Sequence, residues 1–301
     1  MNEMKSQDAP TLSLRGVYKQ YDDFALGPLD LEIEPGTVLA FVGPNGAGKT
    51  TTMHCTMGLV RRDGGEIEVC GQPNDPHRPE WKQDIGFVGE LQGHYRGWTV
   101  EANLHFLAKF FRDFDRTRAL QLADRFGLQL EKKVGALSRG GRAKLALVGA
   151  LAHSPRLLLL DEPTAGLDPV VRAEVLDVLW EILEDGDKSI LYSTHVLSDI
   201  SRLADEIVFL REGQIVRRDA KDTLTDTWRR LSFRLEGELP SIDGVRQHRQ
   251  SGGEHQLVTP DFEATVEVLA EIGAQRIQEA RMTIDEIAVE ILREGHHVAR
   301  D

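Results

Sequence analysis

Eight consecutive residues, Gly43 to Thr50 with the sequence GPNGAGKT, join an apolar segment to a helix-forming one and constrain the fold more than any other part of the chain. The apolar segment, Thr37 to Val42, predicts a buried strand, and the glycines after it allow backbone N–H groups to curve around an anion. The helix that follows points the positive end of its dipole at the same place. Strand, loop and helix in this order predict an α/β fold that binds a nucleoside triphosphate.

The side chains at the end of this loop suit phosphate chemistry. Lys49 is predicted to reach the β- and γ-phosphates, Thr50 to offer its hydroxyl to Mg²⁺, and Thr51 to donate to another phosphate oxygen. A glycine-rich turn that matches by chance is the alternative, and the order of strand, loop and helix disfavours it. The predicted nucleotide contacts of this segment are Gly43, Pro44, Asn45, Gly46, Ala47, Gly48, Lys49, Thr50 and Thr51.

A second apolar run, Leu157 to Leu160, ends in two carboxylates, Asp161 and Glu162. This pattern predicts a buried strand that delivers acids to the phosphate site, with Asp161 holding Mg²⁺ directly or through water. Glu162 is placed to polarise the attacking water, because phosphoryl transfer needs a positioned nucleophile. A core strand with an exposed acidic end is the alternative, which the presence of a phosphate-binding loop disfavours.

A histidine follows a third predicted strand. His195 comes directly after Ser189 to Ser193 and Thr194, so its imidazole is expected at the carboxyl end of the sheet, where open α/β folds bind ligands. There it could hydrogen-bond the γ-phosphate. Taken alone, a histidine at this position is more often structural, and the other motifs favour the functional interpretation.

Composition narrows the cellular setting. The chain has 301 residues and a formal net charge of −13, which disfavours non-specific binding to nucleic acid or anionic lipid. No run approaches the roughly 18 apolar residues of a membrane-spanning helix, and the first ten residues are polar rather than a signal sequence. We therefore expect a cytoplasmic protein that reaches a membrane only through a partner.

Element patterns divide the chain into two domains. Short β-rich runs fill the first 85 or so residues, helical periodicity follows, and β-rich segments then return around a helix from Pro169 to Glu184. The second domain is expected to be α+β and to end in a helix that begins at the capping box Thr283 to Glu286. The predicted boundaries are 1–10 for a flexible N-terminus, 11–218 for the nucleotide-binding domain with a helical subdomain at about 95–153, 219–230 for a linker, 231–295 for the second domain and 296–301 for a tail.

Several motifs in one order resemble the ATP-binding subunits of ATP-binding cassette (ABC) transporters over roughly Leu12 to Arg218. Gly43 to Thr50 matches the Walker A loop, Leu157 to Glu162 matches Walker B, and Ala165 to Asp168 is similar to the D-loop. By the same resemblance Tyr21 stacks on adenine, Asp168 belongs to the nucleotide site and His195 is the switch histidine. The resemblance implies a P-loop NTPase with a RecA-like core, an antiparallel β subdomain and an inserted helical subdomain, and it implies ATP hydrolysis with Mg²⁺.

The segment Leu137 to Arg142 resembles the family's signature, Leu-Ser-Gly-Gly-Gln, with two departures. Arg139 replaces the first glycine and Gly141 replaces the glutamine, while Ser138 and Gly140 remain. A serine followed by glycines at a helix start makes an anion site, and in the family this site completes the ATP pocket of the other subunit. We therefore include Ser138, Gly140 and Gly141 among the nucleotide contacts, across a homodimer or heterodimer.

A further departure lies two residues after the strand Ile85 to Val88, where the family has glutamine and this chain has Glu90. Glutamate can hold Mg²⁺ or its water, and its presence resembles exporters of drugs, antibiotics and polysaccharides. The loop that follows carries Tyr95, Arg96 and Trp98, which by resemblance border the groove for a helix of the transmembrane permease. Packing within the helical subdomain is the alternative for these three residues.

The resemblance implies an ATPase at the cytoplasmic face of the membrane that powers an exporter through a separate permease. Two alternatives stay open: a soluble ATPase of the same superfamily that acts on ribosomes or DNA, and the ATPase of an importer. A single cassette without sustained heptads disfavours the first, and Glu90 with the C-terminal domain disfavours the second. For the C-terminal domain we predict a dimerisation or regulatory surface.

Overall fold

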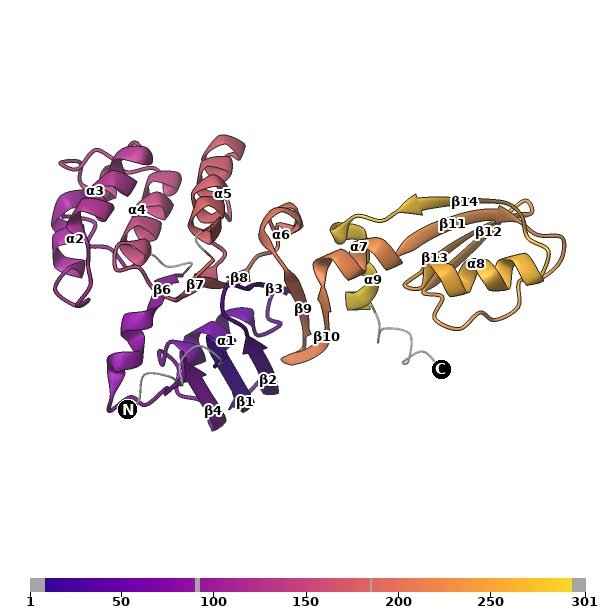
Figure 1. Ribbon diagram of the computed structural model, residues 1–301, viewed down its shortest axis with the longest axis horizontal. Helices are drawn as coiled ribbons and strands as arrows, with labels where there is room; N and C mark the ends of the chain where they lie inside the picture. The colour runs from indigo at the N-terminus through magenta and orange to yellow at the C-terminus, as the bar shows by residue number, and fades with distance from the viewer. Residues whose placement is uncertain (1–8, 90–92, 185, 294–301) are drawn as a thin grey trace. The chain divides into compact units, whose positions relative to one another are not determined.

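The computed structural model describes residues 9–89, 93–184 and 186–293. The chain forms two compact units, Met1–Val216 and Arg217–Asp301 (Figure 1). The predicted boundary between them was two residues later, after Arg218. Each unit has its own sheet and its own apolar core, so each is described separately.

A six-stranded sheet with the order β10-β9-β3-β8-β7-β6 forms the centre of the first unit. The pairings β3–β8, β3–β9, β7–β8 and β6–β7 are parallel, so the carboxyl ends of these strands meet at one edge. Every residue of β3, β7 and β8 is buried, as their near-continuous apolar sequences require in a parallel sheet. The strands are β3 (Val38–Val42), β6 (Ile85–Val88), β7 (Leu157–Asp161), β8 (Ser189–Ser193), β9 (Glu206–Arg211) and β10 (Gln214–Ala220).

A second, antiparallel sheet with the order β2-β1-β4-β5 contributes to one of the unit's two cores. Alternate residues of β2 point into that core, which includes Leu31, Ile33, Phe41 and Met53. The helix α1 (Lys49–Thr56) follows the phosphate-binding loop and contacts β7. The strands are β1 (Leu12–Gln20), β2 (Ala25–Ile33), β4 (Gly64–Val69) and β5 (Gln72–Pro73), and the 3₁₀ helix η1 (Pro79–Asp84) leads into β6.

Helices surround the other core of this unit. The buried α4 packs against α2, α3, α5 and β6, which ties the helical region to the sheet (Figure 1). Short polar side chains cap four of the described helices of this unit: Thr99 for α2, Asp115 for α3, Ser138 for α4 and Asp168 for α5. The elements are α2 (Val100–Leu107), α3 (Arg116–Arg125), η2 (Val134–Ala136), α4 (Arg139–Leu151), α5 (Pro169–Glu184) and α6 (Leu197–Leu203).

The second unit is an antiparallel sheet with the order β12-β13-β11-β14, and α8 lies along one of its faces (Figure 1). Leu231, Phe233, Leu257 and Leu269 form the centre of its core. The predicted capping box is present, since the backbone N–H of Thr283 donates to Glu286 at 2.9 Å and the Thr283 hydroxyl accepts from the Glu286 N–H at 3.3 Å. The elements are β11 (Arg229–Arg234), β12 (Gln247–Ser251), β13 (Glu254–Thr259), α8 (Phe262–Glu271), β14 (Gln275–Arg281) and α9 (Ile284–Arg293).

The segment predicted as a linker, 219–230, contains regular structure instead. It holds the end of β10, the helix α7 (Lys221–Thr227) and the start of β11. Leu224 and Trp228 are fully buried, so two apolar side chains anchor a segment that is otherwise polar. Because the segment is otherwise polar and charged, its composition predicted a linker and did not indicate that these two residues are buried.

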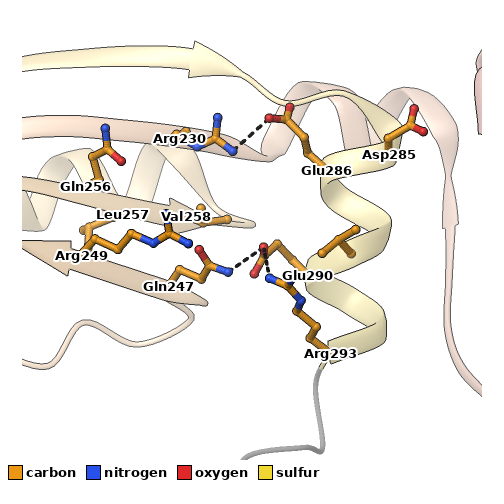
Figure 2. A pocket seen from close by; sticks show the side chains of 11 residues that line it. Arg230, Gln247, Arg249, Gln256, Leu257, Val258, Asp285, Glu286, Glu290 and Arg293 are labelled. Atoms are coloured by element: carbon orange, nitrogen blue, oxygen red, sulfur yellow. Dashed lines mark hydrogen bonds and ion pairs between the residues drawn. The ribbon is translucent and has the colours of Figure 1, made fainter.

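The other face of this sheet is polar. Between it and α9 lies an open cavity of about 580 Å³, into which Arg249 and Gln256 project from the sheet (Figure 2). Arg230 pairs with Glu286 at 3.0 Å, and Gln247 donates to Glu290 at 2.9 Å. These polar contacts join α9 to the sheet around a cavity that stays accessible to water.

Candidate active site

The loop after β3 has backbone conformations that favour glycine. Gly46 and Gly48 have φ of +79° and +108°, in the region that other residues avoid, and a Cβ on Gly48 would lie 2.5 Å from Leu26. Gly48 is also the N-cap of α1, so the free N–H groups of that helix face the loop. These features favour an anion at the loop.

Lys49 lies across this loop. Its Nζ donates to the carbonyl oxygens of Gly43 at 2.7 Å and Pro44 at 3.1 Å, and the residue is only 7% exposed. Burial lowers the pKa of Lys49, although the charges of Glu162 and Asp161 act in the opposite direction. A triphosphate would supply the negative charge that this desolvated ammonium lacks.

Asp161 ends β7 beside Ser193, its register partner on β8. The Asp161 carboxylate is 1% exposed, and one of its oxygens accepts from the Ser193 hydroxyl at 2.9 Å. The other oxygen, Oδ2, has no hydrogen-bond partner. A buried carboxylate oxygen without a donor is costly unless a cation binds it, which is the situation expected of a magnesium ligand.

The described residues contain no group of three His, Cys, Asp or Glu side chains that could form a metal site without further ligands. A metal at Asp161 would therefore need other oxygen donors, such as the Thr50 hydroxyl and phosphate oxygens. Glu90, the third predicted metal ligand, lies outside the described residues.

Glu162 and His195 form a pair at the same edge of the sheet. Glu162 has a φ of +53°, and its backbone N–H donates to the Ser193 carbonyl at 3.0 Å. Its Oε2 lies 2.7 Å from Nδ1 of His195. The Glu162 side chain is 16% exposed and that of His195 is 59% exposed, so both groups can reach a bound ligand and water. This is the geometry of a carboxylate oriented by an imidazole.

A cavity of about 740 Å³ is lined by Lys49, Glu162 and His195, while the predicted site residues Gly43, Pro44 and Asp161 lie outside its lining. It brings together the two motifs that lie far apart in the sequence, the phosphate-binding loop and the pair Glu162 and His195. Its lining consists of Asp23, Phe24, Asn45, Gly46, Ala47, Gly48, Lys49, Thr50, Thr51, Arg139, Glu162, Ala165, Gly166 and His195. Asp23, Phe24, Arg139, Ala165 and Gly166 were not among the predicted site residues. Asp23 and Phe24 belong to no motif, whereas Arg139, Ala165 and Gly166 lie in the signature and D-loop segments, whose place beside this cavity depends on the fold.

Tyr21, predicted to stack on adenine, does not line this cavity. Its ring is 40% exposed and lies 6.3 Å from the ring of Phe24, which does line it. The ammonium of Lys19 lies over the Tyr21 ring, with its Nζ 5.5 Å from the ring centroid. Phe24, but not Tyr21, lines this cavity, and the stacking of Tyr21 on adenine stays a prediction.

The signature segment is an N-capped helix start, as its serine predicts. The Ser138 hydroxyl accepts from the Gly141 N–H at 3.0 Å, and Gly140 is buried against Val171, which a Cβ would approach to 2.9 Å. Ser138, Gly140 and Gly141 do not line the cavity of their own chain. Asp168 lies outside it too and accepts from Val170 and Val171 at 3.1 Å at the start of α5.

A buried network links the segments that follow Glu162 and His195. Asp199 on α6 is 0% exposed and accepts from Thr164 at 2.6 Å, from the Tyr192 hydroxyl at 3.0 Å and from Arg172 Nε at 2.6 Å. Thr164 lies two residues after Glu162, and Asp199 lies four residues after His195. The network therefore fixes both backbones that carry the Glu162–His195 pair.

Comparison with known proteins agrees with this site. Residues 26–165 match the family described as "ABC transporter". The chain is 33% identical over 223 residues to the bacitracin transport ATP-binding protein BcrA of Bacillus licheniformis, covering 73% of each chain. It is 34% identical over 222 residues to the Nod factor export ATP-binding protein I of Burkholderia orbicola, covering 72% of this chain and 73% of that one. The chain belongs to the ATP-binding subunits of ABC transporters.

Solved structures support the same assignment. An ATP-binding subunit of an ABC transporter matches with a TM-score of 0.65 and 25% identity, over 72% of this chain and 92% of that one. A dimeric ATP-binding cassette in a post-hydrolysis state, bound to ADP and Pi, matches with a TM-score of 0.63 and 25% identity, over 69% and 98% of the two chains. The predicted P-loop NTPase fold and ATPase activity are confirmed. No helix in the described part of this ABC subunit has the length and apolar character to cross a membrane.

Proposed function

We propose that this ABC ATPase powers an exporter from the cytoplasmic face of the membrane, as one of two cassettes that bind a transmembrane permease. The observation that carries the enzymatic part is the meeting of Lys49, the unpartnered Asp161 Oδ2 and the Glu162–His195 pair at one edge of the sheet. The names of two relatives, for bacitracin transport and Nod factor export, support the exporter assignment.

Mg²⁺ fits the donors at this edge, with Asp161 and the Thr50 hydroxyl as its protein ligands. When bound, the ion would neutralise charge on the phosphate oxygens during phosphoryl transfer. Lys49 would leave the loop carbonyls for the β- and γ-phosphates. Glu162 would accept a hydrogen bond from the attacking water, and His195 would hold the Glu162 carboxylate in place and donate to the γ-phosphate once ATP is present.

Dimerisation is supported by the signature segment. Ser138, Gly140 and Gly141 form an N-capped helix start outside the cavity of their own chain, and the exposed Ser138 can reach the ATP of a second cassette. ATP would favour the closed dimer, because only that state gives the γ-phosphate contacts from both chains.

A groove in the helical region suits the membrane partner. It has a volume of about 410 Å³ and is lined by apolar and aromatic side chains, including Phe87, Tyr95, Phe106 and Leu107. Tyr95 is 49% exposed and stacks on Trp98 at 4.4 Å, and both rings meet the edge of Phe106. Exposed aromatic side chains beside an apolar groove are typical anchors for a partner helix.

The experiment is affinity purification of the Glu162→Gln variant from its native cell in detergent with Mg²⁺ and ATP, followed by mass spectrometry. Recovery of a multi-span membrane protein, lost when Tyr95 and Trp98 are both changed to alanine, would support the permease assignment. Recovery of ribosomal or DNA-repair proteins without a membrane protein would contradict it and leave only the ATPase chemistry.

A further inference from the structure

The first residue of α4 reaches from the signature segment to the D-loop of its own chain. A Cβ added to Gly166 would lie 2.4 Å from Nη1 and 2.7 Å from Cζ of Arg139, so the guanidinium rests directly against this glycine. Gly166 has a φ of +65°, and both residues line the nucleotide cavity. The signature departure at Arg139 therefore places a cation at the nucleotide cavity of the same chain.

The charges of the residues that line the cavity bear on the role of Arg139. Among the described residues that line the cavity, the lysine and arginine side chains are Lys49 and Arg139, while Asp23 and Glu162 are acidic. No hydrogen bond or ion pair joins the Arg139 guanidinium to the other described residues, and the residue is exposed. An arginine without a partner can offer its planar fork of N–H donors to phosphate oxygens in a bidentate manner.

The place of Arg139 in the cavity indicates which phosphate group it would contact. It enters the cavity beside Ala165 and Gly166, which follow Glu162 in the chain, and so it lies on the side of the hydrolytic pair. We propose that Arg139 is a phosphate-binding residue that acts in its own chain and favours ATP over ADP by contacting the γ-phosphate. This inference rests on the assignment of the cavity as the ATP site, and it differs from the role in the opposite subunit that the signature's Ser138 and Gly140 support.

The guanidinium of Arg139 can lie at this place because Gly166 has no side chain. Because a Cβ at residue 166 would meet the end of a flexible side chain, an alanine there would displace the guanidinium without changing any charge, and at a φ of +65° it would also strain the backbone. The Arg139→Gln background separates the two effects, since strain would persist there without the arginine. Gly166→Ala and Arg139→Gln should therefore weaken binding of the same phosphate. Their effects should overlap and not add.

The test is a fluorescence titration of the full chain with Mg²⁺ and either ADP or the non-hydrolysable β,γ-imido analogue of ATP. Protein is kept at a concentration where light scattering shows a monomer, and circular dichroism confirms that each variant is folded. We expect Arg139→Gln to weaken binding of the ATP analogue about tenfold and ADP less than twofold, with Arg139→Lys in between. Gly166→Ala should reproduce the loss, with no further loss in the Arg139→Gln background.

Equal affinity of wild type and Arg139→Gln for the ATP analogue would overturn the proposal. The proposal would also be overturned if monomeric Arg139→Gln bound the ATP analogue as tightly as wild type while its dimer hydrolysed ATP more slowly. That result would assign Arg139 to the ATP of the opposite subunit. Lys49→Ala is the control for the site itself. If it leaves both nucleotides bound as in wild type, the assignment of the cavity fails, whereas loss with Lys49→Ala alone rejects only the role of Arg139.

Discussion

The two units differ in where most of their functional candidates among the charged side chains lie. In the unit up to Val216, Lys49, Asp161 and Asp199 are each less than 10% exposed and lie at or near the edge of the parallel sheet. In the unit from Arg217, the charged side chains Arg230, Arg249 and Glu290 surround a cavity that water reaches (Figure 2). Burying a charge is costly unless another group compensates, whereas an exposed ion pair contributes only about 0–1 kcal/mol. The second unit also buries Arg229, 7% exposed, which donates to the backbone carbonyls of Thr225 and Trp228. What marks the unit that carries chemistry is therefore the gathering of buried charges of both signs, Lys49 and Asp161, at one edge of a sheet.

The largest expected effect comes from Lys49→Ala. ATP hydrolysis, measured as phosphate release, should fall by at least about 100-fold, because the cation for the β- and γ-phosphates is lost. The free energy of unfolding should not fall, since burial lowers the Lys49 pKa and thus disfavours its charged form in the folded state. Arg249→Ala in the second unit is the matched control and should change neither quantity by a measurable amount. A large loss of stability in Lys49→Ala would show that the buried ammonium contributes to folding and not to nucleotide binding alone.

Asp199→Ala should affect both folding and catalysis. Removing this carboxylate leaves Arg172 and the Tyr192 hydroxyl without a buried partner, so urea unfolding should show a loss of about 3 kcal/mol. ATP hydrolysis should also fall in the protein that remains folded, since the network holds the backbones of Glu162 and His195. Asp177→Ala, which removes an exposed ion pair with Arg202, is the control. Full activity in folded Asp199→Ala would show that the network serves stability alone.

Two core substitutions, one in each unit, separate an effect on folding from an effect on hydrolysis. Leu159→Ala and Leu257→Ala each remove a leucine that is 0% exposed, and each should cost about 2–5 kcal/mol of stability. Hydrolysis should fall with Leu159→Ala, because β7 carries Asp161, and should stay within twofold of wild type with Leu257→Ala. Unfolding curves and phosphate release provide the two readouts. If Leu257→Ala abolished hydrolysis as well, the two units could not be treated as separate.

The smallest effect concerns pH. Burial lowers the pKa of His153 and His94 below the ordinary value of 6.5, so the unfolded chain binds more protons between the folded pKa values and 6.5. Their contribution to stability is complete above pH 6.5 and is lost as the pH falls from 6.5 through the folded pKa values. His153→Gln should flatten the dependence of the unfolding free energy on pH, while His77→Gln, an exposed control, should not. Equal slopes for both variants would contradict the effect.

The parallel sheet and the edge that carries the site were predictable, because adjacent residues encode them. The loop around Lys49 and the acids after β7 each lie within one short segment, and chemistry restricts which residues can occupy them. The contact of Arg139 with Gly166 and that of Thr164 with Asp199 join residues 27 and 35 positions apart, so only the folded chain brings them together.

In the second unit, local sequence patterns predicted some of the helices and strands but not all of them. Its capping box at Thr283 and its strands follow from local sequence, but α7 was missed because Leu224 and Trp228 are isolated apolar residues in a charged segment. The exposed polar face around Arg249 has no motif, since surface positions place few demands on residue identity. Its predicted dimerisation or regulatory role stays a prediction.

The central claim is that Glu162 polarises the attacking water in a site that binds ATP without it. The most direct measurement compares wild type with Glu162→Gln in Mg²⁺ and radiolabelled ATP, recording both phosphate release and the nucleotide retained on the protein. The account predicts that hydrolysis falls by about 10²–10⁴-fold while the variant retains ATP rather than ADP. Hydrolysis by Glu162→Gln at the rate of wild type would contradict the assignment of this carboxylate and, with it, the mechanism proposed for the site.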